Sequence, residues 1–305
     1  MRTSGPNLTR RSGGQLRVQT DPSWGYEMTQ QFWMGWQPDL PDIRDYSVES
    51  NDELAAMFKG SQVVTSAPQL SAKVDLTRWC SPIENQSSIG SCTAQAGVGL
   101  LEYFEIRAFK KHLNASRLFL YKTTRNYLQW TGDTGAYLRS TMAAMVLFGV
   151  PPERYWPYDI TKYDEEPSSF LYSFGASYQS IRYHRLDRPN MSGTQILSRV
   201  KTYLGFRYPS MFGFTVYNYG NSKGEFEFPG SNSSVLGGHA VVAVGYDDNR
   251  KIGSHTGALK IRNSWGTGWG EAGYGWIPYA YVEQGLAVDF WSLFKAEYVK
   301  TARFD

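Results

Sequence analysis

The chain of 305 residues carries a formal net charge of +3, and 15% of its residues are aromatic. This length allows one large domain or two lobes around a substantial core, and the small charge, with Lys and Arg scattered along the chain, argues against nucleic acid as a partner. Two cysteines make no disulfide framework, no stretch approaches the roughly 20 apolar residues that a membrane span needs, and the first twenty residues lack the apolar stretch of a secretory signal, which leaves the compartment open.

Residues 1–70 are predicted to form an appendage rather than part of a domain core. The first twenty residues are rich in Gly, Ser and Arg, a composition typical of mobile chain. The run from Phe32 to Ile43 then combines aromatic residues with two prolines, which disfavour a helix. Such an extended, aromatic segment is suited to lie along another surface of the protein. A loop that closes the main core is an equally open interpretation.

The compact domain is predicted to occupy residues 71–305 and to begin with helices. Apolar residues recur at steps of three and four from Ala94 to Phe109, which indicates a buried helix face. Ser116 is a favourable N-cap for a second helix. A third helix is predicted from Ala136 to Phe148, closed by a glycine and two prolines, and a fourth from about Thr194 to Gly205.

Runs rich in β-branched and aromatic residues follow the helices. Four of them are predicted as strands: Met211–Tyr217, His239–Tyr246, Leu259–Asn263 and Gly273–Ile277. Helices first and strands later are the signature of a two-lobed α+β protein.

Cys92 lies at the predicted N-terminus of the first helix, after a Gly- and Ser-rich turn. Unpaired backbone N–H groups at such a position favour thiolate over thiol, which makes a cysteine nucleophilic. If the preceding loop folds back on the helix start, the amide of Gln86 and the Cys92 N–H converge on one oxygen as an oxyanion hole. The alternative for Cys92 is an inert thiol in the core. That role is also expected for Cys80, with a redox link between the two cysteines as the less favoured interpretation.

His239 and Asn263 are predicted to be neighbours in an antiparallel hairpin. His239 begins one strand and Asn263 ends the next, and a turn centred near Lys251 places the two residues opposite each other. An imidazole held by an amide oxygen presents its other nitrogen in a fixed tautomer, as a general base requires. A coincidental pairing with a turn residue is the alternative. No His or Cys shows ligand-like spacing, so neither a metal site nor a cofactor is expected.

Three groups of residues, in this order along the chain, resemble the papain-like (cathepsin-like) cysteine peptidases. They are Asn85-Gln86 with Gly90-Ser91-Cys92, then Gly238-His239-Ala240-Val241 with Val244-Gly245-Tyr246, and then Asn263-Ser264-Trp265-Gly266 with Gly268-Trp269-Gly270 and Gly273-Tyr274. The resemblance covers roughly Val74 to the C-terminus. It implies a helical left lobe, a barrel-like β-rich right lobe and an active-site cleft between them.

By this resemblance Cys92 is the nucleophile, His239 takes and returns the proton, Asn263 orients the imidazole and Gln86 donates into the oxyanion hole. The substrate-binding positions that it implies are Gly132 and Gly135 along the substrate backbone, Ala240 in the pocket for the residue before the scissile one, and Trp265 over the His–Asn hydrogen bond.

Two departures from the usual pattern, together with Asp42-Ile-Arg-Asp45 upstream, make the chain look more like the bacterial branch of this family. Thr93 stands where plant and animal members usually have Trp, and Ile89 replaces a disulfide cysteine. The first seventy residues also lack the long helical pro-segment pattern of lysosomal cathepsins.

The sequence therefore predicts a cysteine endopeptidase that hydrolyses protein or peptide substrates through a thioester. The segment from Phe32 to Ile43 is predicted to cover the cleft as an intramolecular inhibitor. Two alternatives remain open. The same residues would serve a transpeptidase or ligase that passes the acyl group to an amine, or the scaffold would bind peptides without catalysis.

Overall fold

The computed structural model describes residues 33–42, 45, 47, 70–178, 182–218, 220–221 and 223–294. All of them belong to one compact unit, Phe32–Asp305. The predictions made for residues 1–32 and 48–69 lie outside the described residues. No helix in the described part of the chain is long and apolar enough to cross a membrane.

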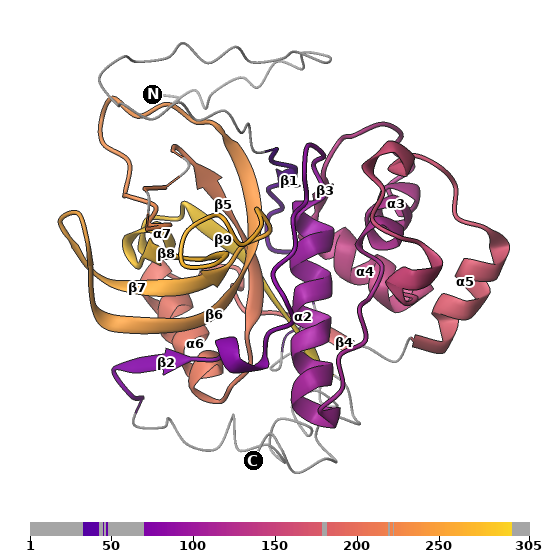
Figure 1. The fold of residues 1–305 in the computed structure, drawn as a ribbon. Coiled ribbons are helices and arrows are strands. Elements are labelled where there is room, and N and C mark those ends of the chain that lie inside the picture. Colours follow the sequence, from indigo (N-terminus) through magenta and orange to yellow (C-terminus); the bar gives the residue numbers. More distant parts are fainter. Residues whose placement is uncertain are drawn as a thin grey trace. The chain divides into compact units, whose positions relative to one another are not determined.

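The central helix is α2 (Cys92–Phe109), which packs against the sheet on one side and against α3 (Arg117–Tyr127) and α4 (Leu138–Phe148) on the other (Figure 1). The predicted caps are confirmed. The Ser116 hydroxyl oxygen accepts a hydrogen bond from the backbone N–H of Phe119 at 3.2 Å, and Gly149 ends α4 with a φ of 67°.

The remaining helices are shorter, and they follow in the second half of the chain. α6 (Gly193–Gly205), which confirms the fourth predicted helix, begins with a reciprocal capping box between Ser192 and Gln195. The others are α5 (Ser169–Gly175) and α7 (Ala280–Glu283), with 3₁₀ turns at Thr77–Trp79, Glu153–Tyr155, Ile160–Lys162 and Ala176–Tyr178.

The β part is an antiparallel sheet of seven strands with the order β4-β9-β5-β6-β7-β8, and β2 pairs with β6 beside this path. Its strands are β2 (Lys73–Asp75), β4 (Arg182–Arg185), β5 (Ser210–Val216), β6 (Gly237–Ile252), β7 (His255–Arg262), β8 (Tyr274–Pro278) and β9 (Ala287–Phe294). Two short strands, β1 (Trp36–Gln37) and β3 (Ala136–Tyr137), form a separate parallel pair. The predicted α+β class is confirmed.

The hairpin of β6 and β7 differs from the predicted register. β6 continues to Ile252 and pairs there with His255, so the turn is shorter and lies farther along the chain than the predicted turn near Lys251. Irregularities between Ala243 and Gly245 and after Asp247 bring the register back toward the predicted one only in part, so that Val242 pairs with Arg262. The predicted register was therefore wrong, but the prediction that His239 and Asn263 are neighbours is confirmed by the hydrogen bond between their side chains.

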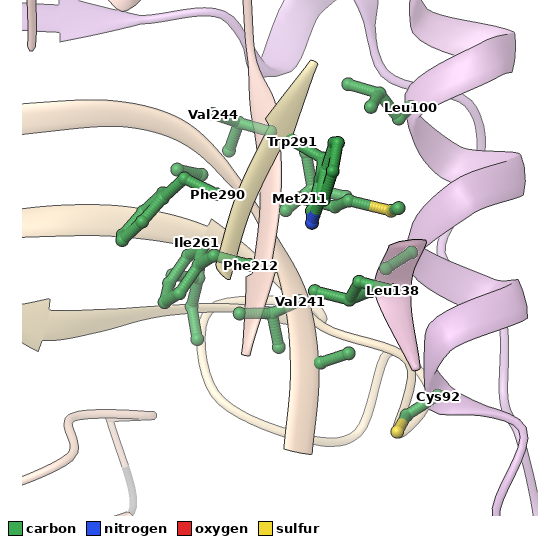
Figure 2. Packing of buried hydrophobic residues seen from close by; sticks show 14 of the residues in the cluster. Cys92, Leu100, Leu138, Met211, Phe212, Val241, Val244, Ile261, Phe290 and Trp291 are labelled. Atoms are coloured by element: carbon green, nitrogen blue, oxygen red, sulfur yellow. The ribbon is translucent and has the colours of Figure 1, made fainter. Parts of the chain in front are cut away.

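The core joins the sheet to α2. Figure 2 shows Met211 and Trp291 between the strands and the helix, with Leu100 facing them from α2 and Phe212 beside Phe290. The rings of Phe212 and Phe290 stack with centroids 4.6 Å apart. This packing holds the start of α2 at a fixed place beside β6, and that place positions the site described next.

Candidate active site

Cys92 is the first residue of α2, and its side chain is fully buried. Figure 2 shows the sulfur at the start of the helix, directed toward the strands. Backbone groups of Gly35, Trp36 and Ala240 lie close enough to the sulfur to favour the thiolate, so the sulfur lies beside the residue that follows His239. Burial raises the pKa of this thiol to about 11, and these backbone groups oppose it only in part. In this covered arrangement desolvation outweighs the predicted effect of the helix start, and the thiol keeps its proton at neutral pH.

His239 and Asn263 are buried and joined by a hydrogen bond of 2.8 Å between the ring Nε2 and the amide Oδ1. The backbone N–H of Ser264 donates to the same Oδ1 at 2.8 Å. Because a backbone N–H can only donate, this amide atom is assigned as oxygen, and the ring Nε2 must carry the proton. Nδ1, which has no hydrogen-bond partner among the described residues, is then the basic nitrogen of the neutral ring.

Aromatic side chains enclose the imidazole of His239. The Trp265 indole stacks on it with centroids 4.6 Å apart and planes inclined by 23°, and the centroid of Phe214 lies 5.9 Å away. Burial lowers the pKa of His239 to about 4, although the hydrogen bond to Asn263 acts in the opposite direction. The ring is therefore neutral at pH 7 while the site stays closed.

The side-chain amide of Gln86 is oriented by Ser264. Its Oε1 accepts a hydrogen bond from the Ser264 hydroxyl at 2.6 Å, and its backbone N–H donates to the Ser264 carbonyl at 2.8 Å. With its oxygen engaged, the amide directs Nε2 to the carbonyl oxygens of Trp33 at 2.8 Å and Ile89 at 3.2 Å. The Gln86 side chain thus directs an N–H donor at the backbone of the segment that contains Trp33.

Gly132 and Gly135 lie on the loop that leads into β3, next to the turn before α2. Both have positive φ values, 81° and 71°, which suit glycine. The Asp133 carboxylate between them accepts a hydrogen bond from the backbone N–H of Gly90 at 2.8 Å, and the N–H of Gly135 donates to the Tyr121 hydroxyl at 3.1 Å. Asp133 therefore fixes the turn before α2 against this loop.

Residues 33–42 lie across the site. β1 pairs in parallel with β3, and the N–H of Ala136 donates to the Gly35 carbonyl at 2.8 Å. Gly35 passes so close to the opposite wall that a Cβ on it would stand 2.0 Å from the carbonyl oxygen of Gly90. The backbone of this segment reaches both the thiol and the amide described above.

The indole of Trp36 occupies a space that we call the indole site, bounded by Gly213, Gly238 and Asp289. A Cβ on Gly213 would lie 1.9 Å from the indole, and one on Gly238 would lie 2.9 Å from it. Only glycine at these two positions therefore leaves space for the indole. The indole N–H donates to the buried Asp289 Oδ2 at 3.2 Å. Gly213 is the strand partner of Ala240, which places the indole site beside the thiol.

Asp39 of this segment and Asp45, just beyond it, pair with arginines of the domain, in a set that we call the acidic clamp. Asp45 accepts from Arg139 Nε at 2.7 Å, and Asp39 pairs with the same guanidinium. Arg185 donates to the backbone carbonyl of Asp39 at 3.0 Å and lies 3.4 Å from the Asp45 carboxylate. The clamp therefore fixes the chain just after the indole site.

The two cysteines are free thiols, and burial raises the pKa of Cys80 to about 11. Within the described residues, no group of three His, Cys, Asp or Glu side chains could hold a metal ion.

Sequence reasoning missed several residues that build this site. Asp289, Arg139 and Asp133 carried no signal in the sequence, because each is a single polar residue in an ordinary context and gains its role only through a distant partner. Trp36 belonged to the aromatic run already singled out, but nothing in the sequence indicated its partner, which lies 253 residues away along the chain.

A family model for papain family cysteine proteases matches residues 70–288. An uncharacterised peptidase C1-like protein of Acanthamoeba polyphaga mimivirus is 30% identical over 271 residues, which cover 84% of this chain and 85% of that protein. Papain of Carica papaya is 28% identical over 197 residues, which cover 63% of this chain and 50% of papain.

Among solved structures, xylellain, a cysteine protease from the bacterium Xylella fastidiosa, is 31% identical. The match has a TM-score of 0.68 and covers 87% of this chain and 97% of xylellain. The family model alone spans well over half of the chain. The chain belongs to the papain family of cysteine proteases.

Proposed function

We propose that this protein is a cysteine endopeptidase that acts through Cys92, His239, Asn263 and Gln86, and that residues 33–42 keep it latent. The observation that carries the first part is the hydrogen bond of 2.8 Å from His239 to an Asn263 oxygen whose identity the next backbone N–H fixes. It leaves the Nδ1 nitrogen free to accept a proton.

In the proposed reaction, His239 Nδ1 takes the proton of the Cys92 thiol, and the thiolate attacks the peptide carbonyl carbon. The resulting oxyanion accepts hydrogen bonds from Gln86 Nε2 and the Cys92 backbone N–H. Collapse breaks the C–N bond, the imidazolium returns its proton to the leaving amine, and a thioester remains. Water, deprotonated by the same imidazole, hydrolyses the thioester and releases the acid.

Latency is supported by what the segment occupies. The Trp33 carbonyl takes the hydrogen bond of Gln86 Nε2 that a substrate oxyanion would need. At the thiol, the segment places the backbone of Gly35 beside the sulfur, in place of a carbonyl carbon open to attack. A substrate has to displace both contacts.

The direction of the segment also supports latency. Trp33, at the Gln86 amide, precedes Trp36, which fills the site beside Ala240. In the arrangement implied by the family resemblance, the residue whose carbonyl is attacked follows the residue that fills the Ala240 pocket. The segment therefore runs opposite to a substrate, and its own peptide bonds are not presented for cleavage.

Burial supports the same conclusion. Under the segment, the pKa values of Cys92 and His239 are shifted apart, to about 11 and about 4, so the neutral pair is favoured over thiolate and imidazolium. Removal of the cover admits water, which lowers the first value and raises the second. Displacement of the segment therefore activates the nucleophile as well as opening the site.

The test compares Trp36→Ala with Leu40→Ala, which alters an exposed side chain of the same segment. Hydrolysis of a fluorogenic peptide should be several-fold faster for Trp36→Ala than for wild type and unchanged for Leu40→Ala, and Cys92→Ala should abolish it in both backgrounds. Equal rates for wild type and Trp36→Ala would contradict latency. Hydrolysis that survives Cys92→Ala would contradict the proposed nucleophile.

A further inference from the structure

The indole site is a built recognition site, because three strands shape it around one side chain. β5 and β6 contribute Gly213 and Gly238, whose missing side chains leave the room for the indole of Trp36. β9 contributes Asp289 at the end of that room. A side chain that enters here lies next to the thiol, because the backbone of Ala240, the strand partner of Gly213, lies beside the Cys92 sulfur.

An irregularity in β9 aims Asp289 into this space. The register between β5 and β9 shifts between Met211 and Gly213, and Asp289 has a φ of 65°, a left-handed conformation that Asp and Asn tolerate better than most residues. The backbone N–H groups of Asp289 and Phe290, which this irregularity turns away from the ladder, donate to the Asp187 carboxylate at 2.9 and 2.7 Å. The orientation of Asp289 is thus fixed by a second carboxylate.

The two oxygens of Asp289 have separate partners. Oδ1 accepts from the Trp291 indole N–H at 2.7 Å and lies 3.3 Å from Arg185 Nη1. Oδ2 accepts from the Trp36 indole N–H. Since fixed donors of the domain hold Oδ1, Oδ2 is the acceptor that the domain offers to whatever fills the indole site.

We propose that Asp289 is a specificity-determining residue that makes this pocket select substrate side chains with an N–H donor at the far end, tryptophan above all. This inference rests on the proposed peptidase function of the same site. Trp36 is the reference occupant, since its ring fits between the glycines and its N–H meets Oδ2. Phenylalanine fills most of the same space but leaves the buried oxygen without a donor, which costs binding free energy.

The sharpest variant is Asp289→Asn, because Asn has nearly the same shape and also tolerates the left-handed backbone. The donors of Trp291 and Arg185 hold the amide oxygen on their side, so the amide NH₂ faces the pocket. A donor then meets the indole donor, and the preference for tryptophan should disappear. Asp159→Asn, at an exposed carboxylate that caps a 3₁₀ turn, is the matched control.

The experiment uses the full chain with Trp36→Ala, which vacates the indole site. Two peptides are compared that differ at a single position, the residue before the one whose carbonyl carbon is attacked. One peptide has Trp at this position and the other has Phe. Burial raises the pKa of Asp289 to about 7, so the assay is run at pH 8, where this carboxyl is mostly ionised. We expect kcat/KM for the Trp peptide to exceed that for the Phe peptide by about tenfold, as a buried hydrogen bond to a charged group implies. The ratio should fall to about one or below with Asp289→Asn and stay unchanged with Asp159→Asn. A ratio near one before Asp289 is changed would overturn the inference, and so would a preference that survives Asp289→Asn.

A binding measurement separates this inference from the proposed function. In Trp36→Ala with Cys92→Ala, which cannot turn over, fluorescence polarisation of the same two labelled peptides should show about tenfold tighter binding of the Trp peptide, again lost with Asp289→Asn. Selective binding without any cleavage by the Cys92 protein would refute the peptidase proposal and keep the specificity of Asp289. Cleavage with equal binding and turnover of both peptides would refute the specificity alone.

Discussion

At the scale of single residues, Ser264 orients both polar amides of the site. Its backbone N–H fixes the oxygen of Asn263 toward His239, and its hydroxyl fixes the oxygen of Gln86 away from the Trp33 carbonyl. The two effects come from different atoms of Ser264, so substitution of its side chain can separate them.

Ser264→Ala removes the hydroxyl and keeps the backbone N–H. Gln86 is then free to rotate its amide, so kcat in an unlatched background such as Trp36→Ala should fall about tenfold, near the value of one neutral hydrogen bond, with KM little changed. The acid limb of the pH–rate profile should stay in place, because the contact between His239 and Asn263 is intact. A shifted acid limb would show that the hydroxyl acts through the imidazole instead.

At the scale of elements, the proposed latency depends on how residues 33–42 are attached. The indole site holds one end of the segment by burial, and the acidic clamp holds the other by charge. The ion pairs of Arg139 in the clamp are only partly buried, so dissolved salt can screen them. The two attachments can therefore be tested separately.

Arg139→Gln weakens the clamp without entering the indole site. We expect a higher basal peptidase rate at low salt than in wild type, because Asp39 and Asp45 lose the Arg139 guanidinium and Asp45 keeps, among the described residues, only the longer ion pair with Arg185. Added salt should raise the rate of wild type more than that of the variant. Arg154→Gln, at an exposed arginine beside Tyr155, is the matched control. If the rates of wild type and Arg139→Gln stay equal at every salt concentration, the clamp does not hold the segment.

Much of the element pattern could be predicted from the sequence. The helices were located because their caps and apolar spacing are local signals, as at Ser116 and Gly149. The register of the hairpin could not be predicted, because irregularities such as the one between Ala243 and Gly245 depend on packing. The catalytic candidates were identified by their motifs. The indole site joins residues from opposite ends of the chain, and no local pattern indicates such a pairing.

At the scale of the whole molecule, the fold buries two neutral histidines. Burial lowers the pKa of His184 to about 3 and that of His239 to about 4. Between pH 6.5, near the unfolded value, and these lowered values, the unfolded chain binds more protons than the folded one. Stability therefore falls as the pH drops through this window.

His239→Gln should remove the part of this pH dependence of stability that comes from His239. Gln has no group that titrates in this range and keeps an N–H donor for Asn263. Between pH 6.5 and 4, the free energy of unfolding of wild type should fall more than that of the variant, by up to roughly 3 kcal/mol at the acid end. Urea unfolding at a series of pH values measures both curves. Curves that stay parallel would contradict a buried, neutral His239.

The most direct test of a latent Cys92–His239 pair is the rate at which a thiol-directed epoxide labels Cys92 in wild type and in Gly35→Ala. The new Cβ would collide with the backbone of Gly90, which Asp133 holds in place, so the segment should lift away. We predict slow labelling of wild type at pH 7, labelling at least tenfold faster for Gly35→Ala, and none after Cys92→Ala. Equal rates for wild type and Gly35→Ala, or no labelling of either protein, would contradict the account.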